Sequence, residues 1–166
     1  MVQPFKDKSN RRVVLALYAL MFLPGLWAGL VLGLAFIETP LKFQAPGMTT
    51  PLALGVGRLV FWALNICELI LCGVLLGSCW IVRQKLDTTI HYVVVAMLIL
   101  IVILQTTVLL PTLRVRTDSI IAGQAVGSST LHMLYAVIEA CKFPLLLAIF
   151  IFAVGWHAKH VGKRVT

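Results

Sequence analysis

The chain has 166 residues, of which 60% are hydrophobic and only 12% are charged, and its mean hydropathy is +0.99. A soluble domain usually has about 25% charged and about 45–50% apolar residues. The composition therefore excludes a soluble enzyme, a disordered tail and a disulfide-stapled secreted module. The formal net charge of +8 does not indicate a nucleic-acid partner, because the basic residues flank apolar runs and form no water-exposed basic face. We expect an integral membrane protein whose main partner is the lipid bilayer.

Four stretches are long and apolar enough to span the membrane, since about 20 residues of helix cross about 30 Å of hydrocarbon. They are residues 13–37, 56–82, 92–110 and 131–156. Helices are expected because lipid offers no hydrogen-bond partner to open backbone groups. The sequence thus predicts an all-α fold, a four-transmembrane-helix bundle that forms a single integral membrane domain over residues 1–166.

The basic residues beside the spans predict the orientation. Nine lie in the N-terminal segment, between the second and third spans, and in the C-terminal segment, against four on the other side. The positive-inside rule places both termini in the cytoplasm. Residues 38–51 and 111–128 then form loops on the outer side. Prolines and a glycine predict coil in the first loop, and the tail of the second, residues 123–129, consists of small residues and is expected to be flexible.

Polar residues recur with the same spacing in the second and fourth spans, at an offset of 74 residues. With the aromatic residue that follows the first member, the two sets are Arg58, Phe61, Asn65 and Glu68, and His132, Tyr135, Glu139 and Lys142. Such a match arises by chance between two amphiphilic helices or from a duplicated two-helix unit. We favour the duplication, which predicts that the second span lies across from the fourth, with Asn65 facing Glu139.

Each set lies on one helix face, because positions i, i+7 and i+10 fall within about 80° at about 100° per residue. Charged groups at mid-bilayer cost about 2.5–3.5 kcal/mol each, so these faces are expected to meet around an outward-opening polar pocket. The candidate binding residues are Arg58, Asn65, Glu68, His132, Tyr135, Glu139 and Lys142. Glu139 and Lys142 are spaced to pair within one helix, which leaves Glu68 as the exchangeable acid.

Metal, cofactor and catalytic chemistry have little support in the residue pattern. No Cys or His pair within a span has a ligand spacing, and His132 is the best remaining metal candidate. All four cysteines lie inside spans, where thiols are usually inert. We predict no metal, no cofactor and no catalytic residues, and we favour a non-enzymatic role.

Glycines recur every fourth residue in the first span, at Gly25, Gly29 and Gly33. This small-xxx-small pattern lets helix backbones approach closely. We expect the ridge to seat the first helix within its own bundle, with a dimer interface as the alternative.

The spacing Arg58-x6-Asn65-x2-Glu68 resembles part of the second-helix signature of the MAPEG family of eicosanoid and glutathione metabolism membrane proteins. The resemblance implies a four-span chain that contacts glutathione through these three residues, between subunits of a trimer. The chain departs from the signature at Phe61, where the family has a second arginine. The family motif also opens to the cytoplasm, whereas the charge distribution places Arg58 outside.

Over most of its length the chain is similar to small bacterial inner-membrane proteins of unassigned activity, some grouped near the copper-resistance D proteins. The residues that carry the similarity are Glu38-Thr39-Pro40, Gly57-Arg58 with Asn65 and Glu68, and Leu131-His132 with Glu139 and Lys142. The resemblance implies a four-helix bundle in the bacterial inner membrane and implies no reaction.

Three classes of function follow from these observations. The first is the binding or transport of a proton, a small cation or a polar solute through the outer pocket, because ionisable groups at mid-depth usually mark a functional site. The second is a structural or assembly subunit, either of a homo-oligomer or of a larger membrane complex. The third is a MAPEG-like glutathione-dependent enzyme.

Overall fold

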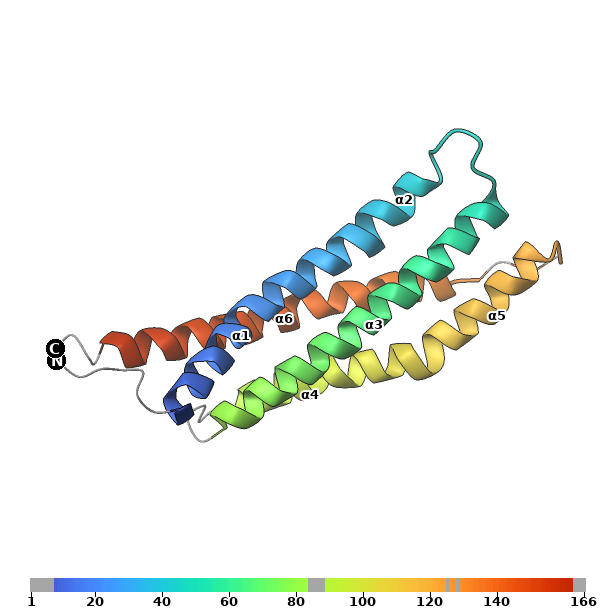
Figure 1. The fold of residues 1–166 in the computed structure, drawn as a ribbon. Helices are drawn as coiled ribbons and strands as arrows, with labels where there is room; N and C mark the ends of the chain where they lie inside the picture. Colours follow the sequence, from blue (N-terminus) through green and yellow to red (C-terminus); the bar gives the residue numbers. More distant parts are fainter. Residues whose placement is uncertain (1–7, 84–88, 125, 128, 163–166) are drawn as a thin grey trace.

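The computed structural model describes residues 8–83, 89–124, 126–127 and 129–162, which form long helices and no strand. The first helical stretch joins α1 (Lys8–Val31), the π-helical segment η1 (Leu32–Glu38) and α2 (Thr39–Lys42). The second is α3 (Thr50–Val82), the third joins α4 (Thr89–Leu104), η2 (Gln105–Leu109) and α5 (Leu110–Ile121), and the fourth is α6 (Leu131–Gly162) (Figure 1). The predicted all-α four-helix bundle is confirmed.

All four stretches are long and apolar enough to cross a membrane. The 33 residues of α3 extend over about 50 Å, which exceeds the hydrocarbon thickness of about 30 Å. Large apolar side chains such as Phe22, Leu59 and Leu100 point outward and are more than 60% exposed. Such a surface is stable against lipid and not against water, so the chain is a multi-pass membrane protein.

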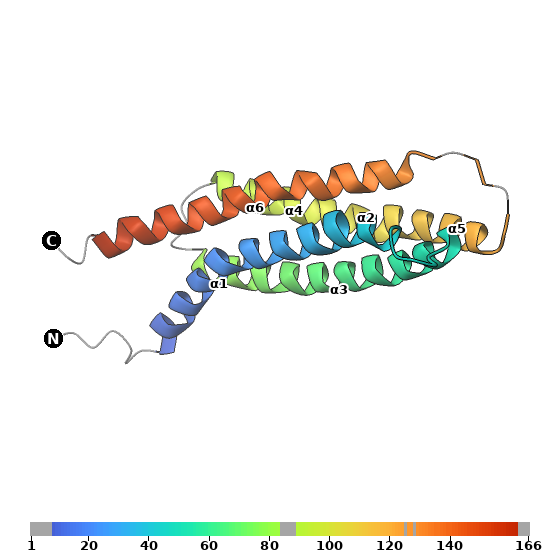
Figure 2. The same ribbon diagram turned by 90° about the horizontal axis from the view of Figure 1, so that it is seen from above.

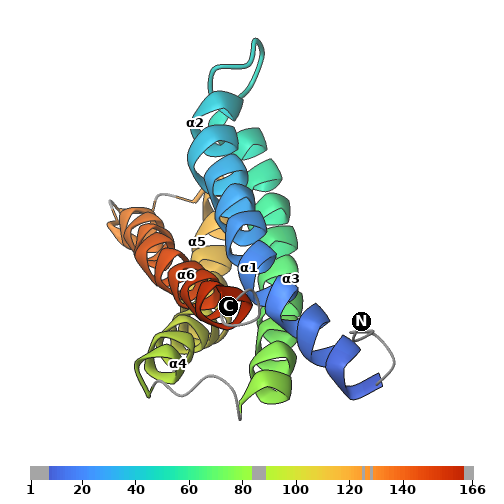
Figure 3. The ribbon, with the colours of Figure 1, turned by 90° about the vertical axis from the view of Figure 1, so that its left-hand side faces the viewer.

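The four helical stretches pack around a common core. In this arrangement α1 lies between α3 and α6 and packs on both (Figures 2 and 3). The third stretch crosses the bundle, because α4 packs on α6 and α5 packs on α3. α3 and α6 therefore lie across the bundle from each other, as predicted. We call the end that holds residues 43–49, 122–124, 126–127 and 129–130 the loop end. The start of α1 and the end of α6 lie together at the opposite, terminal end (Figure 2).

The prediction of loops over residues 38–51 and 111–128, the first of them coil, was wrong for much of both segments. The first stretch continues to Lys42, and α5 continues to Ile121, past Pro40 and Pro111. A proline inside an α-helix lacks an N–H and clashes with a carbonyl one turn earlier. Here each proline is the second residue after a π-helical segment, and the wider turn relieves that clash so that the helix continues.

The glycine ridge does not pack inside the chain, contrary to the expectation. An added Cβ at Gly25, Gly29 or Gly33 would meet no other atom within 4 Å. The ridge instead adjoins an apolar groove between α1 and α6 that is lined by Phe22, Phe143 and Phe150 among others. Close backbone approach at these glycines is therefore open to another helix or to lipid.

Candidate functional site

A fully buried ion network joins α3 to α6 across the middle of the bundle. Glu68, Glu139 and Lys142 each have no exposed surface. The Lys142 ammonium Nζ lies 2.5 Å from Glu68 Oε1 and 3.0 Å from Glu139 Oε2. The expectation that Lys142 pairs within its own helix is thus incomplete, because the lysine bridges both carboxylates. One cation holds two acids on opposite helices.

Two uncharged donors complete the network. The indole Nε1 of Trp27 on α1 donates to Glu68 Oε1 at 2.8 Å, and Nε2 of Gln105 in η2 donates to Glu139 Oε1 at 3.0 Å. All four helical stretches therefore meet at these two carboxylates. Neither Glu68 Oε2 nor Glu139 Oε2 accepts a hydrogen bond from the described residues, although Glu139 Oε2 lies in ion-pair distance of Lys142.

The charges of this network do not cancel. Two carboxylates and one ammonium sum to one negative charge when all three ionise, and the neutral donors do not change the sum. An uncompensated charge in an apolar interior is costly, whereas a bound proton or a cation removes it. The arrangement is therefore chemically suited to hold one exchangeable positive charge.

Asn65 does not face Glu139, which corrects the sequence prediction. Its Nδ2 donates to Thr106 Oγ1 at 2.8 Å, and that hydroxyl donates onward to the Val102 carbonyl at 2.7 Å. The third helical stretch crosses the bundle and places η2 between Asn65 and α6. Asn65 consequently ties α3 to η2 and makes no hydrogen bond to the ion network among the described residues.

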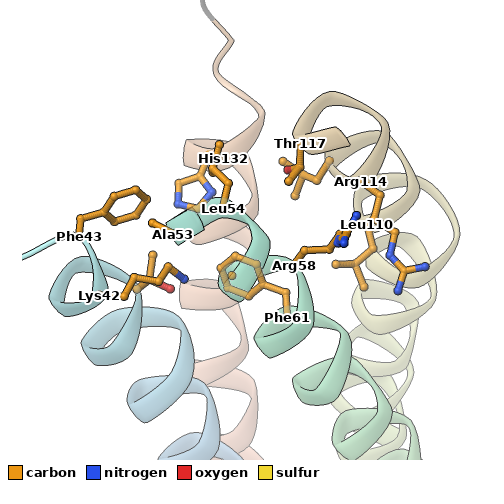
Figure 4. A pocket seen from close by; sticks show the side chains of 13 residues that line it. Lys42, Phe43, Ala53, Leu54, Arg58, Phe61, Leu110, Arg114, Thr117 and His132 are labelled. Carbon is orange, nitrogen blue, oxygen red and sulfur yellow. The ribbon is translucent and has the colours of Figure 1, made fainter. Parts of the chain in front are cut away.

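A separate pocket lies at the loop end, where residues of α2, α3, α5 and α6 converge (Figure 4). Its cavity is about 50 Å³. The basic side chains that line it are Lys42, Arg58, Arg114 and His132, and its apolar wall includes Phe61 and Leu110. Among the described residues that line it there is no acid. Arg58 and His132, which the sequence proposed as binding residues, both line this cavity.

Two of these basic residues have acidic partners outside the pocket wall. Lys42 Nζ lies 3.1 Å from Glu38 Oε2, and the lysine side chain is only 7% exposed. Arg58 pairs with Asp118 on α5. Arg114 has no ion pair among the described residues. The surplus of positive charge therefore remains in the pocket.

The pocket and the ion network are two sites, whereas the sequence predicted one continuous pocket. The loop-end cavity is not lined by the other five predicted binding residues, which are Asn65, Glu68, Tyr135, Glu139 and Lys142. An aromatic layer lies between the two sites, in which the Phe61 and Tyr135 rings are 5.0 Å apart and Phe61 is 6.0 Å from the His132 ring. Bulky rings close the entrance to the network in this conformation.

The terminal half of the bundle contains a further buried polar contact. His91 is fully buried in α4, and its Nε2 lies 3.5 Å from Cys79 Sγ. The sequence placed His91 in a cytoplasmic loop, but α4 begins at Thr89 and carries the ring inward. In the part of the chain that the structure describes, no three His, Cys, Asp or Glu residues group as metal ligands.

Sequence reasoning missed Trp27 and counted Lys42 and Arg114 only as orientation signals. Trp27 was counted with the apolar residues of its span, although a buried indole N–H requires an acceptor. Lys42 follows Glu38 by four residues, which is the spacing of a helical ion pair. That signal would have indicated that the helix continues past Pro40.

The three residues of the MAPEG-like spacing share no partner here. Arg58 contacts Asp118, Asn65 contacts Thr106, and Glu68 contacts Lys142 and Trp27. In comparisons with known proteins, the chain matches no family model, no curated protein and no solved structure.

Proposed function

We propose that this membrane protein binds an exchangeable proton at the buried ion network and exchanges it with the loop-end side, as a binding or translocation protein for a proton or a polar solute. The observation that carries the proposal is the pair of carboxylates on one ammonium, enclosed at zero exposure. Ionisable groups inside a membrane usually mark a functional site. A purely structural pair would need one acid, and here there are two.

Glu68 is the carboxylate that we propose to carry the proton. Glu139 Oε1 accepts from Gln105, and Glu139 Oε2, which accepts no hydrogen bond from the described residues, lies 3.0 Å from the Lys142 ammonium. Glu68 Oε2 has no hydrogen-bond partner among the described residues. The Tyr135 ring lies 5.0 Å from the Phe61 ring at the pocket wall, so only this aromatic layer separates the network from the loop-end cavity.

Replacing Glu68 with glutamine is expected to remove the proton and preserve the fold. The amide still accepts from Trp27, keeps the volume of the side chain and carries no charge to neutralise. Infrared difference spectra during a pH titration should show a protonated carboxyl band in the wild type that is absent from the Glu68→Gln variant. Dye-reported proton uptake into vesicles that contain the protein should fall in the same variant.

Asp118→Asn is the control, because this carboxylate is 56% exposed and lies outside the network. The control should keep the titrating band. A band that survives in Glu68→Gln and disappears in Glu139→Gln would overturn the assignment to Glu68. The absence of the band from all variants and from the wild type would overturn the proposed function.

We also propose that both ends of the chain lie in the cytoplasm of a bacterial cell, with the loop end facing outward across the inner membrane. The excess of basic residues beside the terminal end supports this orientation. Reporter fusions after Thr166 and within residues 123–127 should report opposite sides of the membrane. Fusions on the same side would contradict the topology, and a cytoplasmic loop end would reverse the orientation.

A duplicated two-helix unit remains part of the proposal. The two π-helical segments, Leu32–Glu38 and Gln105–Leu109, lie at corresponding places when the 74-residue offset is applied. Each precedes a short continuation of its helix at the loop end. This agreement in an uncommon backbone feature supports a common origin for the two halves.

An assembly subunit is the second candidate, and the open glycine ridge favours it. Gly25 and Gly29 are exposed beside an apolar groove, which would let a helix of another chain pack closely on α1. Purification in mild detergent separates the cases. A stable hetero-complex that is lost on Gly29→Leu substitution would support assembly, whereas a chain that purifies alone with its titrating carboxyl supports the first function.

A further inference from the structure

We infer that the loop-end pocket is an oxyanion site, which takes the phosphate or carboxylate group of an amphiphilic molecule. This inference deepens the proposed function, because it names the ligand class of the loop-end side. It argues against the small cation that the sequence allowed. The argument rests on the charge, the position and the shape of the pocket.

The charge of the pocket selects an anion. Lys42, Arg58 and Arg114 line the cavity, and the described lining residues include no acid. Even when the acidic partners Glu38 and Asp118 are included, one positive charge remains. Arg114 supplies it, since this guanidinium has no ion pair among the described residues. A guanidinium donates in a planar fork that fits two oxygens of a carboxylate or phosphate.

The side chain of Lys42 packs against the backbone of α3 at Gly57. A Cβ at Gly57 would lie 2.8 Å from Lys42 Nζ and 3.3 Å from its Cε, so the glycine leaves the space that the amine occupies. Lys42 Nζ also lies 5.4 Å from the centre of the Phe61 ring. A buried amine that is seated over a glycine and an aromatic ring is oriented toward the interior of the pocket (Figure 4).

The shape of the pocket indicates an amphiphile. The cavity of about 50 Å³ has room for one small oxyanion or a few waters, because a water needs roughly 10–15 Å³ of such space. Leu54, Leu110 and Leu113 form an apolar wall beside the basic groups. Arg58 lies two turns into α3, near the level where the hydrocarbon of a bilayer begins. The head of an anionic lipid and a soluble anion can both reach this level.

The test uses the purified full-length protein in non-ionic detergent, with binding measured by native mass spectrometry. The probes are phosphatidylglycerol, phosphatidylcholine as the zwitterionic comparison, and inorganic phosphate as the soluble source. Phosphatidylglycerol should bind the wild type, and Arg114→Gln should weaken binding about tenfold, the loss expected for one charge-assisted hydrogen bond. Arg116→Gln is the matched control, because it removes the same charge from the same helix outside this pocket.

Gly57→Ala provides a second variant that keeps every charge. The methyl group would displace only the flexible end of Lys42, so the fold should survive while phosphatidylglycerol binding falls. Inorganic phosphate that binds with the same variant pattern would identify a soluble anion as the source, within the same site. Equal losses in Arg114→Gln and Arg116→Gln, or equal binding of phosphatidylcholine, would overturn the inference. The Glu68→Gln variant should bind the lipid normally, so the failure of this inference is distinguishable from the failure of the proton proposal.

Discussion

Replacing Lys142 with methionine is expected to lower the free energy of unfolding by about 3–5 kcal/mol, as the removal of one partner of a buried ion pair does. The variant leaves Glu68 and Glu139 without their shared cation at the centre of the bundle. Trp27 and Gln105 continue to donate to one carboxylate each, but neither residue carries a charge. Denaturant titration in micelles measures the change.

The double variant Lys142→Met with Glu68→Gln should recover part of this loss, because it removes one stranded carboxylate together with the lysine. The coupling energy between neighbouring sites in such a cycle is typically about 0.5–3 kcal/mol. Leu146→Met is the control on the same helix. Leu146 is 2% exposed, and an apolar exchange of similar volume should cost less than about 1.5 kcal/mol. A Lys142→Met variant that unfolds like this control would show that the network contributes nothing to stability.

The bundle was predictable from the sequence because the thickness of the bilayer requires apolar runs of a certain length, and such runs are visible in the sequence. The ends of the helices were not predictable in this way. Pro40 and Pro111 are ordinary helix-stop signals, and the one local sign of a continuing helix, the spacing of Glu38 and Lys42, does not reveal the π-helical turn that accommodates the proline. The two outer segments are consequently shorter than predicted, and the loop-end pocket is built on helices instead of coil.

The ion network was partly predictable because helical periodicity places residues of one helix on one face. Glu68, Glu139 and Lys142 were found in this way, and they lie together as expected. The rotation of one helix relative to another is not encoded in that periodicity. Asn65 therefore received the wrong partner, since the crossing of the third stretch brings Thr106 to it. Trp27 was missed because the sequence analysis treated its indole as an apolar group, and the acceptor of its N–H, Glu68, is apparent only in the folded structure.

Trp27→Phe is expected to lower the free energy of unfolding by about 1–3 kcal/mol, the cost of a lost hydrogen bond to a buried charged acceptor. Trp27 is 1% exposed and its indole donates to Glu68 Oε1 at 2.8 Å, so phenylalanine keeps much of the packing and removes the donor. The carboxylate would then depend on Lys142 alone. Thermal and denaturant unfolding in the same detergent measure the loss.

Trp62→Phe is the matched control, since Trp62 is 51% exposed on α3 and makes no hydrogen bond within the described part of the chain. We expect this change to be nearly neutral. If the exposed and the buried tryptophan variants lose equal stability, the effect comes from ring size and the indole contributes no donor of consequence. If only Trp27→Phe is destabilised, and its titrating carboxyl band shifts relative to the wild type, the indole acts on Glu68 itself. The first helix then belongs to the site, and its role is to stabilise the charge state of the acid that exchanges the proton.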